Sequence, residues 1–249
     1  LTYMYYTFTS TVTTETDWGL TRAYGAYRMI GSWLYGQIGQ GDWRRYSWVA
    51  PDAAGTHEGY KQYDSLTIAG DKVPCSLLNE EEWKELPAYV NTKFRPANGN
   101  RADAYAGQFI SLPLMRVEEM KFIDMECTAH LDGVAAGVAA LNSFVNTYRY
   151  TDNSYQANAT TMDEFVKELM IQKRIEFWGE GITYFDYKRL ALQVRRKDNT
   201  NYEPIAQINS KPGYVCPWMN FFILEYESQK NVACKPNPDT SGSLTVTNQ

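Results

Sequence analysis

Two carboxylates four residues apart form the densest polar group in the sequence. Glu176 and Glu180 flank Trp178, and on a continuous helix this spacing places both carboxylates on one face. Such a pair beside an aromatic ring could supply the acid and the base of a glycoside hydrolase. Glycosidase carboxylates usually come from separate elements around a cleft, however, whereas nearby cations can pair with these two in a structural network. We prefer the ion-pair interpretation, in which the neighbouring cations are Lys173, Arg174 and Arg189.

Other residue types that catalyse reactions or bind metals lack a recognisable pattern. The two histidines, His57 and His130, belong to no H-E-x-x-H motif and have no cysteine at ligand spacing. The four cysteines contain no C-x-x-C pair, although one bridge, such as Cys216 to Cys234, stays open. The glycines of residues 36–41 lack the order of a dinucleotide-binding loop. The sequence therefore predicts no enzyme, and it indicates no metal ion and no cofactor.

Aromatic residues are the positive signal of the composition. Tyr, Phe and Trp make up 14% of the 249 residues, and four of the 7 Trp lie in the first fifth of the chain. A sugar ring presents an apolar C–H face rimmed by hydroxyl groups, so it stacks well on an aromatic ring that has polar neighbours. The early tryptophans therefore favour carbohydrate binding, although core packing is the more common role of any one of them.

The charge and hydropathy patterns exclude two further classes of protein. The 24 Lys and Arg against 29 Asp and Glu give a net charge of −5, without a long basic run. Nucleic-acid-binding proteins concentrate cations on one face, so nucleic acid is a poor partner for this chain. The longest apolar stretches also fall far short of the roughly 18 residues that a membrane-spanning helix needs. We therefore expect neither nucleic-acid binding nor a transmembrane helix.

The chain divides into two parts of different character. Residues 1–113 contain many turn formers between 51 and 110, and we expect a loop-rich segment with short strands and one helix from about residue 20 to residue 35. Residues 114–249 show helical periodicity instead. The predicted fold class is therefore mainly α, with tetratricopeptide-like helix pairs and a loop-rich, irregular face.

Four helices are predicted in the second part, over about residues 114–132, 134–148, 161–177 and 182–194. Gly133 separates the first two helices, and Thr161 with Glu164 forms a capping box at the start of the third. The spacing of 3, 4 and 4 residues in the first helix indicates a buried stripe of Met120, Ile123, Cys127 and Leu131.

Several short motifs occur in a defined order. Residues 116–119 read R-V-E-E, similar to R-x-A-E, and residues 42–45 read D-W-R-R, similar to D-P-R-R. The most specific group combines residues 174–176 (R-I-E), 180–181 (E-G) and 185–186 (F-D) with Arg189. Because these motifs occur in this order along the sequence, the chain resembles the SusD/RagB family of nutrient-binding lipoproteins from Bacteroidetes.

This resemblance implies a non-catalytic receptor for nutrients. Family members lie on the surface of the outer membrane, held by a lipidated N-terminal cysteine, over a TonB-dependent transporter of the SusC type, and they hold oligosaccharides for import. They are considerably longer, so residues 114–249 would be their C-terminal helical domain and residues 1–113 the expected ligand face, with the lipid anchor outside this chain. The resemblance also implies that Arg174, Glu176, Glu180 and Asp186 belong to the helical scaffold.

Glycan contacts in this family come from variable loops, so the candidates here are chosen by position. Trp18 lies in a polar loop and would stack on a sugar ring, while Asp17 or Arg22 would bond its hydroxyl groups. The further stacking candidates are Trp33, Trp43 and Trp48. The alternative from another class is a helical-repeat adaptor that binds a peptide or protein in its groove.

Overall fold

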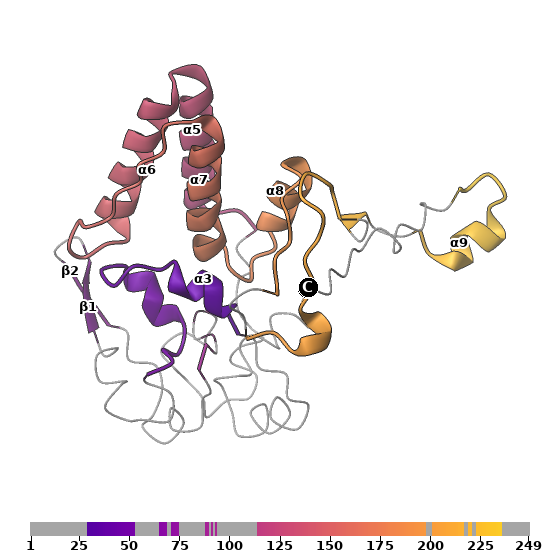
Figure 1. Cartoon of the computed structure of the whole chain (residues 1–249), viewed down its shortest axis with the longest axis horizontal. Helices are drawn as coiled ribbons and strands as arrows, with labels where there is room; N and C mark the ends of the chain where they lie inside the picture. The colour runs from indigo at the N-terminus through magenta and orange to yellow at the C-terminus, as the bar shows by residue number, and fades with distance from the viewer. Residues whose placement is uncertain are drawn as a thin grey trace. The chain divides into compact units, whose positions relative to one another are not determined.

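The computed structural model describes residues 29–52, 65–68, 71–74, 88–89, 91, 93, 114–197, 201–216, 219–220 and 223–235. These residues are mainly helical, which confirms the predicted fold class, and they include a single two-stranded sheet. The elements in chain order are α3 (Ser32–Gly36), the 3-10 helix η1 (Trp43–Ser47), β1 (Ser65–Ile68), β2 (Asp71–Pro74), α5 (Val117–Leu131), α6 (Val134–Tyr148), α7 (Met162–Glu176), α8 (Thr183–Arg189), the 3-10 helix η4 (Pro204–Ala206) and α9 (Glu225–Lys230) (Figure 1).

The chain forms two compact units. The first contains residues 1–30 and 34–176, and the second contains residues 31–33 and 177–249. The first unit holds α5, α6 and α7, and the second holds α8, η4 and α9. The predicted boundary at residue 113 stays a prediction.

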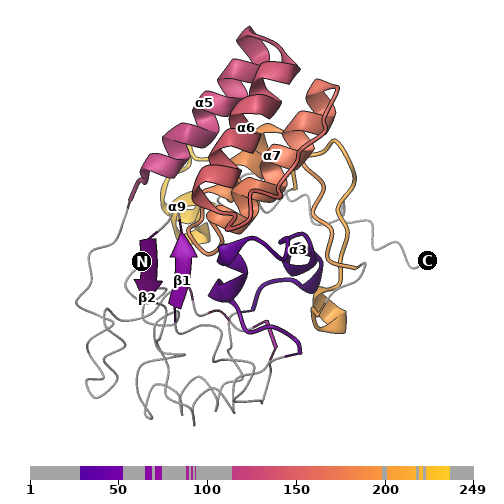
Figure 2. The same ribbon diagram turned by 90° about the vertical axis from the view of Figure 1, so that its left-hand side faces the viewer.

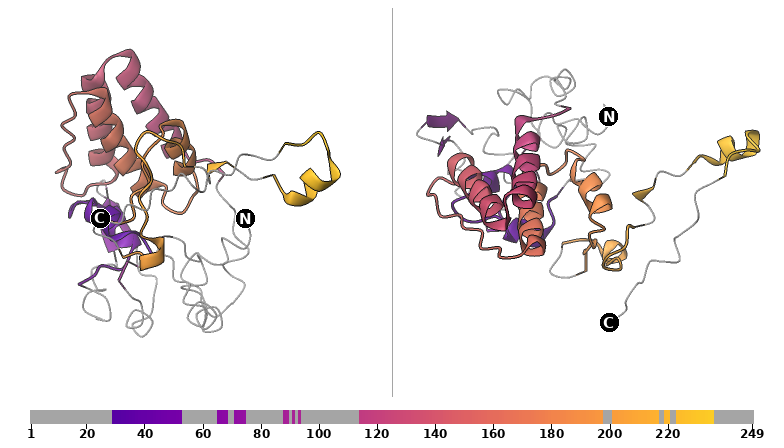
Figure 3. Two further views of the ribbon diagram at one scale, coloured as in Figure 1. Left: turned by 45° about the vertical axis from the view of Figure 1, so that its right-hand side comes forward. Right: turned by 90° about the horizontal axis from the view of Figure 1, so that it is seen from above.

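Three helices make the core of the first unit. Helices α5 and α6 form an antiparallel pair, and α7 lies beside them in every view (Figure 2, Figure 3). Extended chain joins α6 to α7 and is held along α6 by two asparagines. Asn142 bonds both backbone groups of Ala157, and Asn146 does the same for Tyr155. The chain therefore returns to the end at which α6 begins before it enters α7.

The predicted helix boundaries in this core are confirmed. Gly133 separates α5 from α6 with φ of 99°, a conformation that favours glycine. The capping box before α7 is formed in both directions, since Glu164 N donates to Thr161 Oγ1 at 3.3 Å and Thr161 N donates to Glu164 Oε2 at 3.2 Å. These short-range signals are sufficient to start and stop the helices.

The predicted buried stripe of α5 is wrong. Met120, Ile123, Cys127 and Leu131 are all exposed, whereas the buried residues of this helix are Phe122, Met125 and Ala129. Small residues determine which face of α5 is buried. Gly137 of α6 lies so close to Ala129 that a Cβ at position 137 would clash with the Ala129 side chain. Phe122 then meets Phe144 of α6 edge to face, with ring centroids 5.6 Å apart.

Two further expectations concern helix α8 and the loop-rich N-terminal part of the chain. Helix α8 ends at Arg189 instead of about residue 194, and Ala191 beyond it has φ of 48°, which a continuing helix does not allow. The predicted helix over residues 20–35 lies mostly outside the described residues, and its last part coincides with α3. Two short strands do occur in the loop-rich part, where β1 and β2 pair antiparallel with Leu66 opposite Val73.

Candidate functional site

The carboxylate of Glu176 accepts hydrogen bonds from three arginines. Arg149 donates to it from Nε at 2.8 Å and from Nη2 at 3.0 Å, Arg44 donates from Nη1 at 3.1 Å, and Arg116 donates from Nη1 at 3.2 Å. Glu176 is only 6% exposed. Burial alone would raise its pKa, but the hydrogen bonds and charge of Arg149, with the charges of Arg44 and Arg116, lower the pKa of Glu176 to about 2.

The three arginines come from three different elements of the first unit. Arg44 lies in η1, where Asp42 caps the turn by accepting from Arg44 N at 2.9 Å and holds the guanidinium with its other oxygen at 2.7 Å. Arg116 immediately precedes α5, and Arg149 immediately follows α6. Glu176 is the last residue of α7. The group therefore joins the ends of all three core helices to the N-terminal turn.

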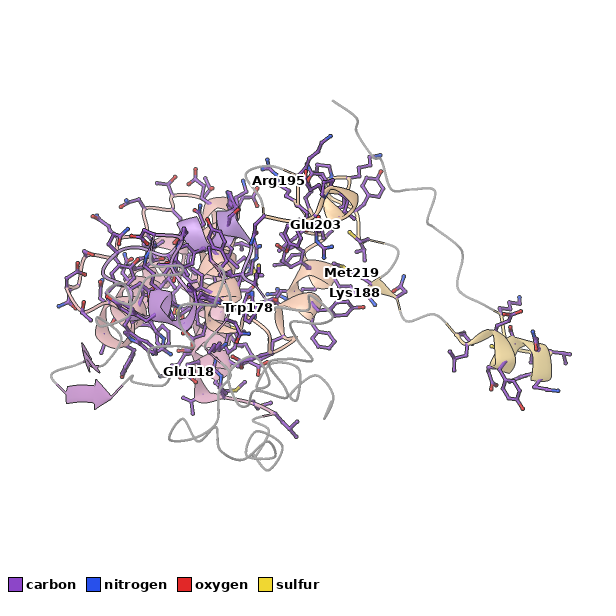
Figure 4. The ribbon with its side chains drawn as sticks, turned by 90° about the horizontal axis from the view of Figure 1, so that it is seen from below. Glu118, Trp178, Lys188, Arg195, Glu203 and Met219 are labelled. Atoms are coloured by element: carbon purple, nitrogen blue, oxygen red, sulfur yellow. The ribbon has the colours of Figure 1, made fainter. Side chains whose placement is uncertain are left out.

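Charges balance within this group, which we call the Glu176 cluster and define as Asp42, Arg44, Arg116, Glu118, Arg149 and Glu176. Glu118 lies on the first turn of α5 (Figure 4) and accepts from Arg116 at 3.1 Å and from Arg149 at 3.1 Å. Three guanidinium groups thus face three carboxylates. Removal of one partner from such a group is costly, because it leaves an uncompensated charge in a largely buried place.

The cluster shows that Glu176 is ion-paired, although not with the predicted cations, and it argues against the hydrolase. A general acid needs a raised pKa and access to a substrate, whereas Glu176 is buried and ionised. Its partners nevertheless differ from the nearest cations in sequence. Arg44 and Arg149 lie 132 and 27 residues from Glu176, so helical spacing could not identify them.

Three of the six proposed glycan contacts lie within the described residues, and their surroundings differ. Asp17, Trp18 and Arg22 lie outside the described residues. Trp48 is 1% exposed and therefore packs in the interior, with no ring face open to a sugar. Trp43 is half-buried, and its Nε1 donates to Tyr148 O at 2.8 Å while the guanidinium of Arg149 lies 5.5 Å from its ring centroid. Trp43 thus packs against the edge of the Glu176 cluster.

Trp33 is the candidate that retains an open surface. It lies in α3 and is 39% exposed. Two residues from the second half of the chain contact the two residues that precede it, Gly31 and Ser32. Ser32 N donates to Asn201 Oδ1 at 2.9 Å, and the Cε2 atom of Tyr202 lies 3.5 Å from the position that a Cβ would take at Gly31. These neighbours are about 170 residues away in the sequence, so no local pattern could associate them with Trp33.

The remaining expectations about metals, bridges and membranes can be compared with the described residues. In this part of the chain, no group of three His, Cys, Asp or Glu residues could hold a metal ion. Cys216 and Cys234 are free thiols, so the bridge that the sequence left open is not formed. None of the helices that the structure describes is long and apolar enough to cross a membrane.

Comparisons with known proteins point in one direction. Residues 9–222 match the sequence model of the SusD family. Among solved structures, the fold is similar to a SusD-like carbohydrate binding protein from Bacteroides vulgatus, with a TM-score of 0.56 and 18% sequence identity. The match covers 93% of this chain and 44% of that protein, so the chain spans less than half the length of its structural relative. No curated protein matches the sequence significantly.

Proposed function

This chain belongs to the SusD family, and on that premise we propose that it binds an oligosaccharide or polysaccharide without cleaving it. The family match over residues 9–222 is the observation that carries the proposal, because it includes both the N-terminal turn and the helical core. The structural relative from Bacteroides vulgatus is described as carbohydrate binding, which is consistent with this assignment.

Two features of the chain support binding rather than catalysis. Trp33 offers a partly exposed aromatic ring, as stacking on a sugar requires. Glu176, one of the two carboxylates of the hydrolase interpretation, is instead held ionised between arginines. The proposed stacking residue is therefore Trp33, and Trp18, Asp17 and Arg22 remain candidates for the same ligand face.

Affinity gel electrophoresis tests the proposal directly. The 249-residue chain is run through native gels that contain one polysaccharide each, with bovine serum albumin as a reference for non-specific retardation. We expect at least one polysaccharide to retard the chain, and the same glycan incubated with the chain for a day to release no reducing sugar. Retardation by none of a broad panel would contradict glycan binding, and release of reducing sugar would contradict a purely binding role.

We further propose that the native protein acts at the surface of the outer membrane, where a lipid anchor holds it and a TonB-dependent transporter of the SusC type receives the glycan. Family membership supports this arrangement. Affinity purification from detergent-solubilised membranes, with an antibody against residues 114–200, tests it. Co-purification of a TonB-dependent barrel and a diacylated N-terminus on the captured protein are expected, and capture from the soluble fraction alone would contradict the proposal.

A second candidate function is a helical-repeat adaptor, and the outer face of α5 favours it. Met120, Ile123 and Leu131 on this face are 43–83% exposed, which is typical of a surface that another helix covers. Competition separates the two functions. If soluble oligosaccharide displaces the chain from insoluble polysaccharide, the glycan-binding function holds, and if only a peptide or protein ligand binds, the adaptor function replaces it.

A further inference from the structure

We propose that Trp33, Tyr202 and Arg196 form a binding site for an anionic glycan, one that carries carboxylate or sulfate groups. This inference rests on the proposed glycan-binding function and names the chemical class of the ligand. It concerns the second unit alone, which contains all three residues.

Two contacts join the segment of Tyr202 to the residues that precede Trp33. Tyr202 packs its ring edge against Gly31, with 3.5 Å between Tyr202 Cε2 and the Cβ position of that glycine. The neighbouring Asn201 accepts from Ser32 N at 2.9 Å, so the segment around residue 202 is fastened to the first turn of α3. Trp33 follows Ser32 directly. Trp33 and Tyr202 therefore belong to two segments that are joined at Gly31 and Ser32, and each of the two side chains is 39% exposed.

Arg196 adds a cation to this pair of rings. Its guanidinium carbon lies 5.2 Å from the centroid of the Tyr202 ring, within the range of a cation–π contact. The backbone around Arg196 is fixed, because its N–H donates to Ile208 O and to Asn209 Oδ1, both at 3.0 Å. A guanidinium has five N–H donors in a planar fork, so Arg196 can stack on Tyr202 and still donate to a carboxylate or sulfate.

The combination of groups matches an acidic sugar. A pyranose ring offers an apolar face for the aromatic rings, and an acidic substituent at its rim offers paired oxygen atoms for the guanidinium. A neutral sugar would use the rings but would gain less from the cation. The site therefore favours anionic over neutral glycans.

Local charge supports this preference. The chain as a whole has a net charge of −5, but residues 186–211 contain six Lys or Arg against three Asp or Glu, of which Asp186 pairs with Arg189 at 2.9 Å. Arg195 and Glu203 lie in the same part of the second unit (Figure 4). An antiparallel β-bridge between Arg195 and Asn209 joins the two sides of this segment. The six cations are Lys188, Arg189, Arg195, Arg196, Lys197 and Lys211. An anionic ligand would thus approach a locally positive surface of a negatively charged protein.

Binding of purified oligosaccharides to the 249-residue chain tests the inference. The probes are oligogalacturonate, a sulfated galactan fragment and a neutral galactan fragment of similar length, and isothermal titration calorimetry gives the three dissociation constants. We expect at least one anionic probe to bind about tenfold more tightly than the neutral probe, and its affinity to fall as sodium chloride is raised. The anionic probe that binds more tightly shows whether the site prefers carboxylate or sulfate.

Variants assign the effect to the site. Arg196→Gln should weaken the anionic probe about tenfold and leave the neutral probe nearly unchanged, while Trp33→Ala should weaken both. Lys230→Gln is the matched control, because Lys230 Nζ lies 5.8 Å from the ring centroid of Tyr226 in the same unit, has the same kind of contact and is not one of the six cations named above. Thermal unfolding of each variant confirms that it is folded. Arg196→Lys keeps the positive charge, so it should bind the anionic probe more tightly than Arg196→Gln does.

Other outcomes overturn the inference in distinguishable ways. If neutral and anionic probes bind equally, or if Arg196→Gln has no more effect than Lys230→Gln, the anionic site is wrong while glycan binding stands. Unchanged binding in Trp33→Ala would place the glycan site elsewhere in the chain. If no glycan binds the unsubstituted chain at all, the proposed function itself fails.

Discussion

At Glu176, one carboxylate accepts hydrogen bonds from three guanidinium groups while almost none of its surface meets water. Glu176→Gln would leave Arg44, Arg116 and Arg149 with one negative charge fewer in a buried place. We expect the free energy of unfolding to fall by about 3–5 kcal/mol, because removal of one partner leaves an uncompensated buried charge. Urea unfolding followed by far-UV circular dichroism measures it. Glu225→Gln on the exposed helix α9 is the control and should change stability far less.

The same carboxylate predicts how stability depends on pH. The pKa of Glu176 is lowered to about 2 in the folded chain from an ordinary value of 4.5, so the folded state binds this proton more weakly than the unfolded state. Its contribution to stability is complete above pH 4.5 and is lost as the pH falls from 4.5 towards 2. We expect the urea midpoint to drop over this range, and to drop less in Glu176→Gln. Equal slopes in both proteins would contradict the lowered pKa.

For single residues, the sequence indicated only those interaction partners that lie close by along the chain. The ion-paired state of Glu176 followed from the cations around it, and the structure confirms that it is paired. The actual partners, Arg44 and Arg149, come from other elements, and their approach depends on packing that no local spacing encodes. The same limit applies to Trp33, whose neighbours Asn201 and Tyr202 are brought to it by the fold.

Among the elements, α5 gives the sharpest test of which helix face is buried. Phe122 is 0% exposed and packs on Phe144, whereas its sequence neighbour Ile123 is 43% exposed. We expect Phe122→Ala to lower the free energy of unfolding by about 3–5 kcal/mol, since it leaves a cavity. Ile123→Ala should cost well under about 1 kcal/mol, as exposed positions usually do. Urea unfolding of both variants decides between the faces, and the reverse order would restore the face predicted from sequence.

Helix ends were predictable and helix faces were not, for different physical reasons. A boundary depends on a few adjacent residues, such as Gly133 or the pair Thr161 and Glu164, and these act on their own backbone. The buried face depends on which helix packs against it. On α5 both faces carry apolar residues, so the periodicity alone was ambiguous, and the close approach of Gly137 to Ala129 decided the outcome.

For the whole molecule, the family was recognisable from ordered motifs even though the sites were not. The D-W-R-R turn at residues 42–45 and the R-I-E motif at residues 174–176 place Arg44 and Glu176 in one cluster, which explains why motifs so far apart occur together. Both motifs therefore report on the scaffold. Ligand contacts need only exposed aromatic rings and polar groups. Because many different sequences supply these groups, no fixed motif marks the ligand contacts.

The division into two compact units predicts that stability is not uniform along the chain. The first unit contains the Glu176 cluster and the long helices α5, α6 and α7, whereas the second contains the short elements α8, η4 and α9. Hydrogen exchange followed by mass spectrometry should therefore show slower exchange in α5–α7 than in residues 201–216. Phe122→Ala should accelerate exchange in the three helices and leave residues 201–216 unchanged. Equal acceleration in the three helices and in residues 201–216 would mean that the two units unfold together. In that case a ligand bound near Trp33, in the second unit, would stabilise α5–α7 of the first unit as strongly as the second unit itself.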